Sequence, residues 1–156
     1  MRGPPNKLQG LHDLRSQTRD ERAQALVAAE EALTRAEAAQ AALDAAYEAA
    51  RGHYERRARS ASGARPVREV QAAEDELRAA FEACGLAERT ARVHRETVVP
   101  TALVTRDGAA RALVEAERDL ELVARHQARQ RAQAEQDEAR RREAELDDWT
   151  AERRGP

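Results

Sequence analysis

Apolar residues recur every seven positions along the first half of the chain. One series consists of Leu26, Leu33, Gln40, Tyr47 and Tyr54, and a second series three places behind it consists of Ala29, Ala36, Leu43 and Ala50. This is the a/d pattern of a coiled-coil helix. Neither Gly nor Pro occurs between Leu11 and Arg51. The pattern therefore predicts one helix over about residues 11–57, with Gly52 weakening its last turns.

The N-terminal segment departs from this frame. Residues 1–10 contain two Pro and two Gly, which predicts a flexible N-terminus. Apolar residues then keep a 3–4 spacing in a shifted frame at Leu8, Leu11, Leu14 and Thr18. A stutter near residues 19–25 would account for the shift.

A second seven-residue series follows a polar break. Ser60, Ser62, Gly63 and Pro66 are turn formers, so we expect a turn at residues 58–66, with Pro66 in the first turn of the next helix. The next helix, over about 66–98, carries Val70, Leu77, Cys84, Ala91 and Val98 at a positions. Its d positions are Ala73, Ala80 and Ala87, with His94 as the exception.

Pro100 interrupts this second series. Proline lacks an amide donor and clashes with the preceding turn, so the helix is predicted to kink or stop there. Asp107 and Gly108 indicate the N-cap region of a third helix, over about 107–153. Its apolar stripe includes Leu113 and Leu120 and thins beyond Gln127. A charged helix of this kind is solvated or binds a partner.

The predicted fold is all-α, a single helical coiled-coil domain over 11–154. Its second arm is kinked or broken near Pro100, and the alternative is an elongated three-helix bundle. The 156 residues include 36 alanines and only 3% aromatics. Because alanine removes little apolar area from water, we expect an elongated molecule with a thin seam rather than a thick core.

Residues with catalytic chemistry do not cluster. His12, His53, His94 and His126 share no ligand spacing, and neither a phosphate-binding loop nor a nucleophile motif occurs. We expect no enzyme activity, no metal and no cofactor. Cys84 lies at a seam position, where it is interpreted as a small packing residue. The net charge of −2 argues against nucleic-acid binding, and the absence of an apolar span or signal predicts a cytoplasmic protein without membrane insertion.

Two segments are candidate partner-binding surfaces. The predicted turn concentrates positive charge. We assign Arg56, Arg57 and Arg59 to its basic tip. The tip could meet an acidic partner surface or anionic lipid, or it could be a solvated turn. The second segment surrounds Trp149, the only tryptophan, with Leu146 on the same helix face. This pair could anchor a partner, or it could cover the helix start at Leu8, Leu11 and Leu14.

The end of the chain resembles the FliJ/YscO family of type III secretion and flagellar export proteins. The resemblance lies in the basic run at residues 140–142, followed by Glu143, Glu145, Leu146, Asp147, Asp148 and Trp149. Chain length and helix layout also agree with this family. From this stretch we take Arg141, Arg142, Glu145, Leu146 and Trp149 as candidate partner-binding residues.

The resemblance implies a long antiparallel coiled-coil hairpin with both termini at one end. It also implies a stalk protein that inserts into the export ATPase hexamer, promotes its assembly, and contacts the export gate and escort chaperones. Such a stalk would be peripheral at the secretion apparatus. Pro100 departs from the continuous helix of the family. Alternative functions are a helical escort chaperone for secretion substrates and a structural coiled-coil oligomer.

Overall fold

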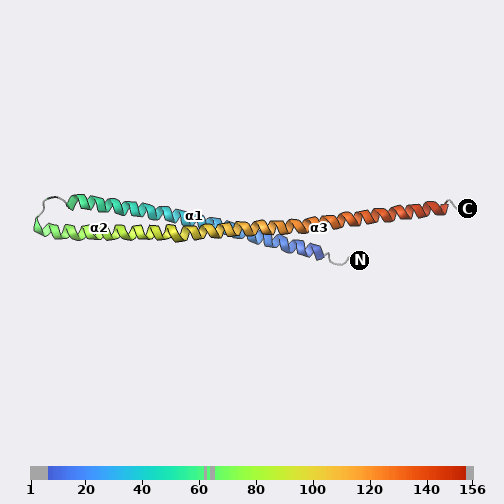
Figure 1. Ribbon diagram of the computed structural model, residues 1–156, viewed down its shortest axis with the longest axis horizontal. Coiled ribbons are helices and arrows are strands. Elements are labelled where there is room, and N and C mark those ends of the chain that lie inside the picture. Colours follow the sequence, from blue (N-terminus) through green and yellow to red (C-terminus); the bar gives the residue numbers. More distant parts are fainter. Residues whose placement is uncertain (1–6, 62, 64–65, 154–156) are drawn as a thin grey trace. The chain divides into compact units, whose positions relative to one another are not determined.

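The structure is a computed structural model that describes residues 7–61, 63 and 66–153. It contains α1 (Lys7–Ala61), α2 (Val67–Val93), a π-helical turn η1 (His94–Val98) and α3 (Val99–Arg153) (Figure 1). Among the described residues there is no strand, and only Gly63 and Pro66 lie outside the helices. The prediction of an all-α chain is confirmed.

The helix bounds differ from the predicted ones at both ends of α1. The helix begins at Lys7, within the segment predicted to be flexible, and it ends at Ala61, within the predicted turn. Alanine and arginine are strong helix formers, and the Ser60 hydroxyl donates to the Arg57 carbonyl at 3.0 Å, which supports these last residues. Residues 1–6 of the predicted flexible segment and residues 62, 64 and 65 of the predicted turn lie outside the described chain.

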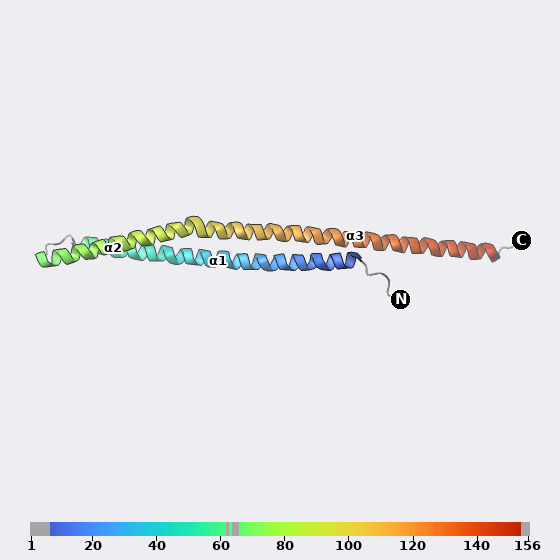
Figure 2. The same ribbon diagram turned by 90° about the horizontal axis from the view of Figure 1, so that it is seen from below.

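The chain divides into two compact units, and α1 and α3 contribute to both. In the unit of residues 25–110, α1 lies beside α2 in the opposite direction (Figures 1 and 2). As residue numbers rise along α1, the residues that they contact on the other helix have falling numbers, which is the pattern of an antiparallel pair. Asp44 contacts Arg95, and further along α1 the Tyr54 ring lies 5.7 Å from the Phe81 ring. Arg57 contacts Glu76 at 2.5 Å.

The seam of this unit is built from the predicted positions. Every predicted a and d residue of α1 from Leu26 to Tyr54 is buried or half-buried. The buried apolar residues among those described are all alanines, namely Ala29, Ala36, Ala80 and Ala91 here and Ala116 in the other unit. Alanine allows the helix backbones to approach closely but buries little area. The expectation of a thin seam is confirmed.

The other unit joins residues 7–24 of α1 to residues 111–153 of α3. Arg15 contacts Asp119 at 2.8 Å, and the Gln127 side-chain amide donates to the Leu8 carbonyl at 2.8 Å. The predicted stripe residues Leu113, Leu120 and Val123 are half-buried. The two helices therefore run in opposite directions in this unit as well.

The shifted frame predicted for the start of α1 agrees with the structure only in part, since Leu8 and Thr18 are half-buried whereas Leu11 and Leu14 are not. Leu11 and Leu14 are 38% and 58% exposed. The residues Leu8, His12, Arg15 and Arg19, at spacings of four, three and four, are half-buried instead. These positions fall in the downstream heptad frame, but Arg22, the next position of that frame, is exposed, and Ala23 is half-buried instead. Long polar side chains can occupy such positions because their aliphatic stems pack while their charged ends reach a partner, as Arg15 reaches Asp119.

Pro100 does not end the helix. The backbone stays helical from Val67 to Arg153, and the π-helical turn lies just before the proline. There the Val99 amide donates to the His94 carbonyl, five residues back rather than four. A π-helical turn widens the backbone, and such turns and prolines are recognised causes of helix bends. Figure 2 shows the ribbon bending where green passes into yellow. The three-helix alternative needs a chain reversal here, which the structure does not contain.

Asp107 and Gly108 do not form a helix start either. Both lie inside α3, eight and nine residues after its first residue. Glycine inside a helix costs about 1 kcal/mol relative to alanine. The half-buried residues Ala109, Ala110 and Leu113 and the buried Ala116 follow directly on the packed face. Their burial offsets the weak local preference, so the N-cap interpretation is wrong.

Candidate partner-binding surfaces

The part of α3 that follows Gln127 has no covering element among the described residues. Every residue from 128 to 149 is exposed, whereas Gln127 is half-buried. We call residues 128–149 the C-terminal arm. Leu146 and Trp149 are its large apolar residues, and they are 60% and 51% exposed. Figures 1 and 2 show this orange-to-red part of α3 running on past the start of α1.

The position of the arm decides between two interpretations of Trp149. Covering the helix start would require contact with Leu8, Leu11 or Leu14. However, Leu8 lies beside Gln127, and Trp149 is 22 residues further along the helix, which corresponds to about 33 Å. Trp149 therefore does not cover the start of α1 within the unit that contains both.

The other predicted partner-binding residues lie on the same arm. Arg141, Arg142 and Glu145 are all exposed. Arg142 lies 3.4 Å from Glu138, one turn before it, and both side chains are more than half exposed. Exposed pairs of this type contribute little to stability. The arm thus carries exposed charged side chains and two large exposed apolar residues on one helix.

The predicted basic tip is less positive in three dimensions than in sequence. The first turns of α2 add four carboxylates to this end of the unit, namely Glu69, Glu74, Asp75 and Glu76. Arg57 is bound to Glu76, and the Arg59 side chain donates to the Glu55 carbonyl at 3.3 Å. The Arg56 side chain folds back over Gly52, 3.3 Å from where a Cβ atom would stand. Local interactions therefore engage Arg57 and Arg59.

Glu55 also holds Arg51 at 3.0 Å. This hydrogen bond, with the charge of Glu55, raises the pKa of the Arg51 guanidinium above its ordinary value. Because arginine is already charged throughout the physiological range, the shift introduces no pH dependence.

Reversing the charge of the tip should matter little for folding. Changing Arg56, Arg57 and Arg59 to Glu removes exposed interactions worth under about 1 kcal/mol each. We expect the thermal midpoint, measured by circular dichroism, to fall by only a few degrees. Any partner that binds here should bind more weakly, with an effect that shrinks as salt is raised. A large loss of helicity would show that the tip is part of the packed structure.

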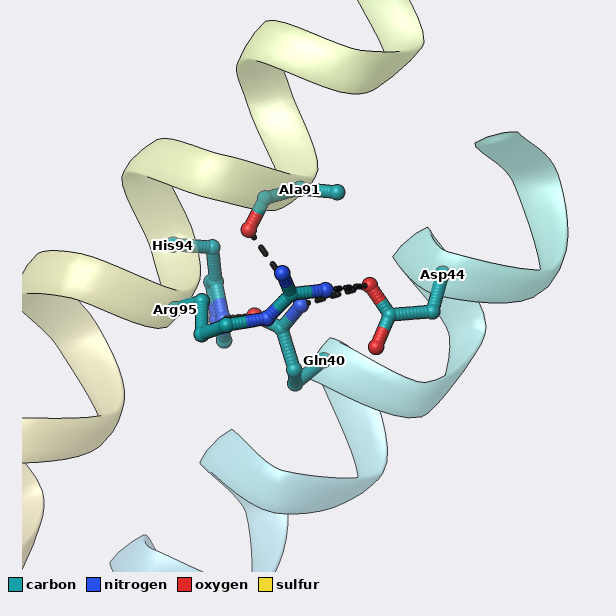
Figure 3. A network of polar contacts seen from close by, with 5 residues as sticks. All are labelled: Gln40, Asp44, Ala91, His94 and Arg95. Carbon is teal, nitrogen blue, oxygen red and sulfur yellow. Dashed lines mark hydrogen bonds and ion pairs between the residues drawn. The ribbon is translucent and has the colours of Figure 1, made fainter. Parts of the chain in front are cut away.

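A polar cluster that was not among the expectations from the sequence lies at the π-helical turn (Figure 3). Gln40 of α1 interrupts the seam, and its side-chain amide donates to Asp44 at 2.8 Å and to the Ala91 carbonyl at 3.2 Å. Its side-chain oxygen lies 2.9 Å from the His94 Nδ1 atom. Arg95 donates to the same Asp44 carboxylate at 2.6 Å.

A signal for this cluster existed in the sequence. Gln40 is the polar residue in the first a series, and His94 is the exception in the second d series. Heptad spacing alone does not pair residues of two helices, because the register between the helices is unknown. A polar residue at one seam position is a known means of fixing helix register. The chemistry of the cluster fits that structural role.

Removing Gln40 should destabilise residues 25–110. Gln40→Ala deletes donors to Ala91 and Asp44 and the partner of His94, all part-buried. We expect a loss of about 1–2 kcal/mol in the free energy of unfolding, measured by urea denaturation. Gln17→Ala is a matched control, since Gln17 makes only an exposed bond to Glu21 one turn later. Equal effects of the two changes would mean that the cluster does not stabilise the helix pair.

No group of three or more described His, Cys, Asp or Glu residues could hold a metal ion. No described helix is long and apolar enough to cross a membrane. Cys84 is a half-buried free thiol on the seam, in agreement with a packing role.

Comparison of the chain with protein-family models, with curated proteins and with solved structures finds no significant match. The resemblance to the FliJ/YscO family therefore rests on the residues of the C-terminal arm and on the helix layout.

Proposed function

We propose that this chain is a non-enzymatic stalk or adaptor that binds a protein partner through its C-terminal arm. The observation that carries the proposal is the exposure of the whole arm, on which Leu146 and Trp149 are 60% and 51% exposed. Large apolar side chains on a solvent-exposed helix are typical of an interaction site. Tryptophan in particular is enriched among the residues that dominate binding energy.

The partner that we propose is the ATPase ring of a bacterial type III export apparatus. This choice rests on the resemblance of residues 140–149 to the FliJ/YscO family, and it makes the protein a cytoplasmic component, peripheral at the secretion apparatus. Contacts with the export gate and with escort chaperones belong to the same proposal. The stalk itself would be the antiparallel coiled-coil hairpin of that family. The antiparallel contacts and the alanine seam within residues 25–110 support this packing.

The proposed mechanism is geometric. A rigid and asymmetric helical rod contacts the subunits of a ring unequally. If the rod binds one nucleotide state of a subunit more tightly than another, it shifts the population of that state. The ring in turn affects the affinity for the rod by the same coupling free energy. The chain needs no catalytic residue for this effect.

The two alternative functions have less support. An escort chaperone that shields substrates with its alanine seam would need that seam to be accessible. However, Ala80 and Ala91 are 6% and 3% exposed. If the chain were a structural oligomer without an ATPase partner, this function would not account for the exposed apolar residues of the arm.

Co-purification with a truncated control tests the proposal. The full chain and a chain ending at Gln127 are used as baits in cells that contain the secretion system, and bound proteins are identified by mass spectrometry. We expect the full chain to recover the export ATPase and the truncated chain to lose it. Circular dichroism must first show that the truncated chain still melts cooperatively. Recovery of the ATPase by both baits, or by neither, would reject the proposal.

A further inference from the structure

The π-helical turn changes which residues of the second arm face the seam. Before the turn, packed residues recur every seven positions at Leu77, Cys84 and Ala91, which are buried or half-buried. Val98 is the next residue of this series, but it is 43% exposed, and Val99 is half-buried in its place. The turn therefore adds one residue to the helix and moves Val98 out of the seam.

The displaced valine lines an open pocket of about 400 Å³ beside the turn. The lining residues are Leu43, Arg89, Thr90, Val93, His94 and Val98. Val93 is 56% exposed, so the apolar wall of the pocket faces solvent. This volume lies within the range of binding pockets in proteins, and π-helical turns are frequent at functional sites. The pocket therefore has room for a large apolar side chain.

The charges of the pocket wall indicate the chemistry of its occupant. Arg89 is exposed and makes no ion pair among the described residues, and His94 adds positive charge when it is protonated. None of the six lining residues carries a carboxylate. Because opposite charges favour association and like charges oppose it, the pocket suits a large apolar side chain with carboxylates beside it.

A second pocket, of about 370 Å³, adjoins the first, and Arg89 lines both. Its wall also contains Glu82 and Glu88, which make no ion pair among the described residues. We call the two pockets together the α2 groove. Along the direction of the helix, the groove presents two carboxylates first and then Arg89, followed by the apolar wall at Val93.

The C-terminal arm carries the complementary order of charges. Its basic run at residues 140–142 comes first, and Glu145 follows it. Trp149 comes four residues after Glu145, just as Val93 comes four residues after Arg89. A parallel alignment therefore places the basic run near the carboxylates of the groove, Glu145 beside Arg89, and the Trp149 ring at the apolar wall. The reverse alignment would place Glu145 near those carboxylates instead.

We propose that the C-terminal arm of one copy of this chain binds the α2 groove of a second copy, with the two helices parallel and Trp149 in the apolar pocket. The contact joins two different surfaces, so it can close into a ring or propagate. It uses the same arm as the proposed function but does not rest on the ATPase. Because small interfaces are typical of transient association, we expect a dissociation constant on the order of 10 μM.

Sedimentation equilibrium of two full-length variants, each lacking one half of the contact, tests the proposal without any ATPase. Val93→Glu disables the groove, and Trp149→Glu disables the arm. Both residues are more than half exposed, so both variants should melt as the unchanged chain does. We expect the unchanged chain to self-associate, each variant alone to be a monomer, and an equimolar mixture of the two to form a 1:1 complex.

Val104→Glu is the matched control, because Val104 is a 66% exposed valine that does not line the groove. It should self-associate as the unchanged chain does. An unchanged chain that stays monomeric well above 10 μM, or a mixture of folded variants that forms no complex, would overturn the proposal. Loss of association in the Val104→Glu control would do the same, since the effect would not be specific to the groove.

A charge exchange tests the parallel alignment. Arg89→Glu and Glu145→Arg should each weaken self-association about threefold or more, with an effect that shrinks as salt is raised. The double variant should recover the affinity of the unchanged chain, because Glu at position 89 then meets Arg at position 145 of the other copy. If the two losses add in the double variant, the two residues do not meet and the alignment is wrong.

Discussion

Ala91→Glu is expected to destabilise residues 25–110 by about 3 kcal/mol or more, because it places bulk and charge where only a methyl group fits. Ala91 is 3% exposed, the least exposed of the buried alanines. Its carbonyl also receives the Gln40 amide at 3.2 Å, so a displaced backbone would disturb the polar cluster as well. The free energy of unfolding from urea denaturation is the quantity to measure.

Ala83→Glu provides the matched control for this change. Ala83 lies on the same helix, two turns earlier, but its side chain is exposed. Substitutions at such positions usually change stability by less than about 0.5 kcal/mol. If both variants unfold at the same urea concentration, the alanine seam does not hold the two helices together.

Replacing Leu146 and Trp149 together by alanine is expected to impair partner binding far more than folding. Both residues are more than half exposed, on an arm that nothing else in the described chain covers. If they anchor the ATPase ring, the double change should cost about 2 kcal/mol or more, which is roughly a 30-fold loss of affinity. Binding is measured by titration of the assembled ATPase, and folding by thermal melting of the same samples.

Leu122→Ala separates this effect from a general loss of apolar surface. Leu122 is 62% exposed on the same helix, before the arm begins. It should bind the ATPase as the unchanged chain does. A melt lowered by many degrees in the Leu146 and Trp149 double variant, with binding intact, would instead make Trp149 a core residue.

The seven-residue spacing was sufficient to predict which residues form the seam. The a and d residues of α1 and most of those of α2 are buried or half-buried, because a helix with this repeat can bury only one stripe. The thinning of the stripe beyond Gln127 likewise predicted where burial stops. Both features depend only on the spacing of apolar residues along the chain, and this spacing can be read directly from a single sequence.

Features that depend on the neighbouring helix were not predictable in this way. The effect of Pro100 was overestimated, since a π-helical turn before it keeps the backbone helical. Leu11 and Leu14 were assigned to the seam by their hydrophobicity, but the seam positions beside them belong to His12 and Arg15. Arg15 is accommodated there through Asp119, which lies more than a hundred residues away in sequence.

The candidate binding surfaces also combine features that local sequence predicts with features that depend on the neighbouring helix. The exposure of Leu146 and Trp149 agrees with their assignment as partner-binding residues, which itself awaits a binding experiment. The basic tip is less positive than the sequence of the turn indicated, because carboxylates from the first turns of α2 lie at the same end of the unit. The cluster of Gln40 and His94 was visible only as two separate interruptions until the register of the helices was known.

ATP hydrolysis by the purified export ATPase, titrated with the full chain and with the chain ending at Gln127, tests the central claim most directly. The claim is that the C-terminal arm binds and stimulates the ring while the rest of the molecule folds without it. We expect saturable stimulation by the full chain and none by the truncated chain at equal concentration, with both chains folded. Equal stimulation by the two chains would contradict the account.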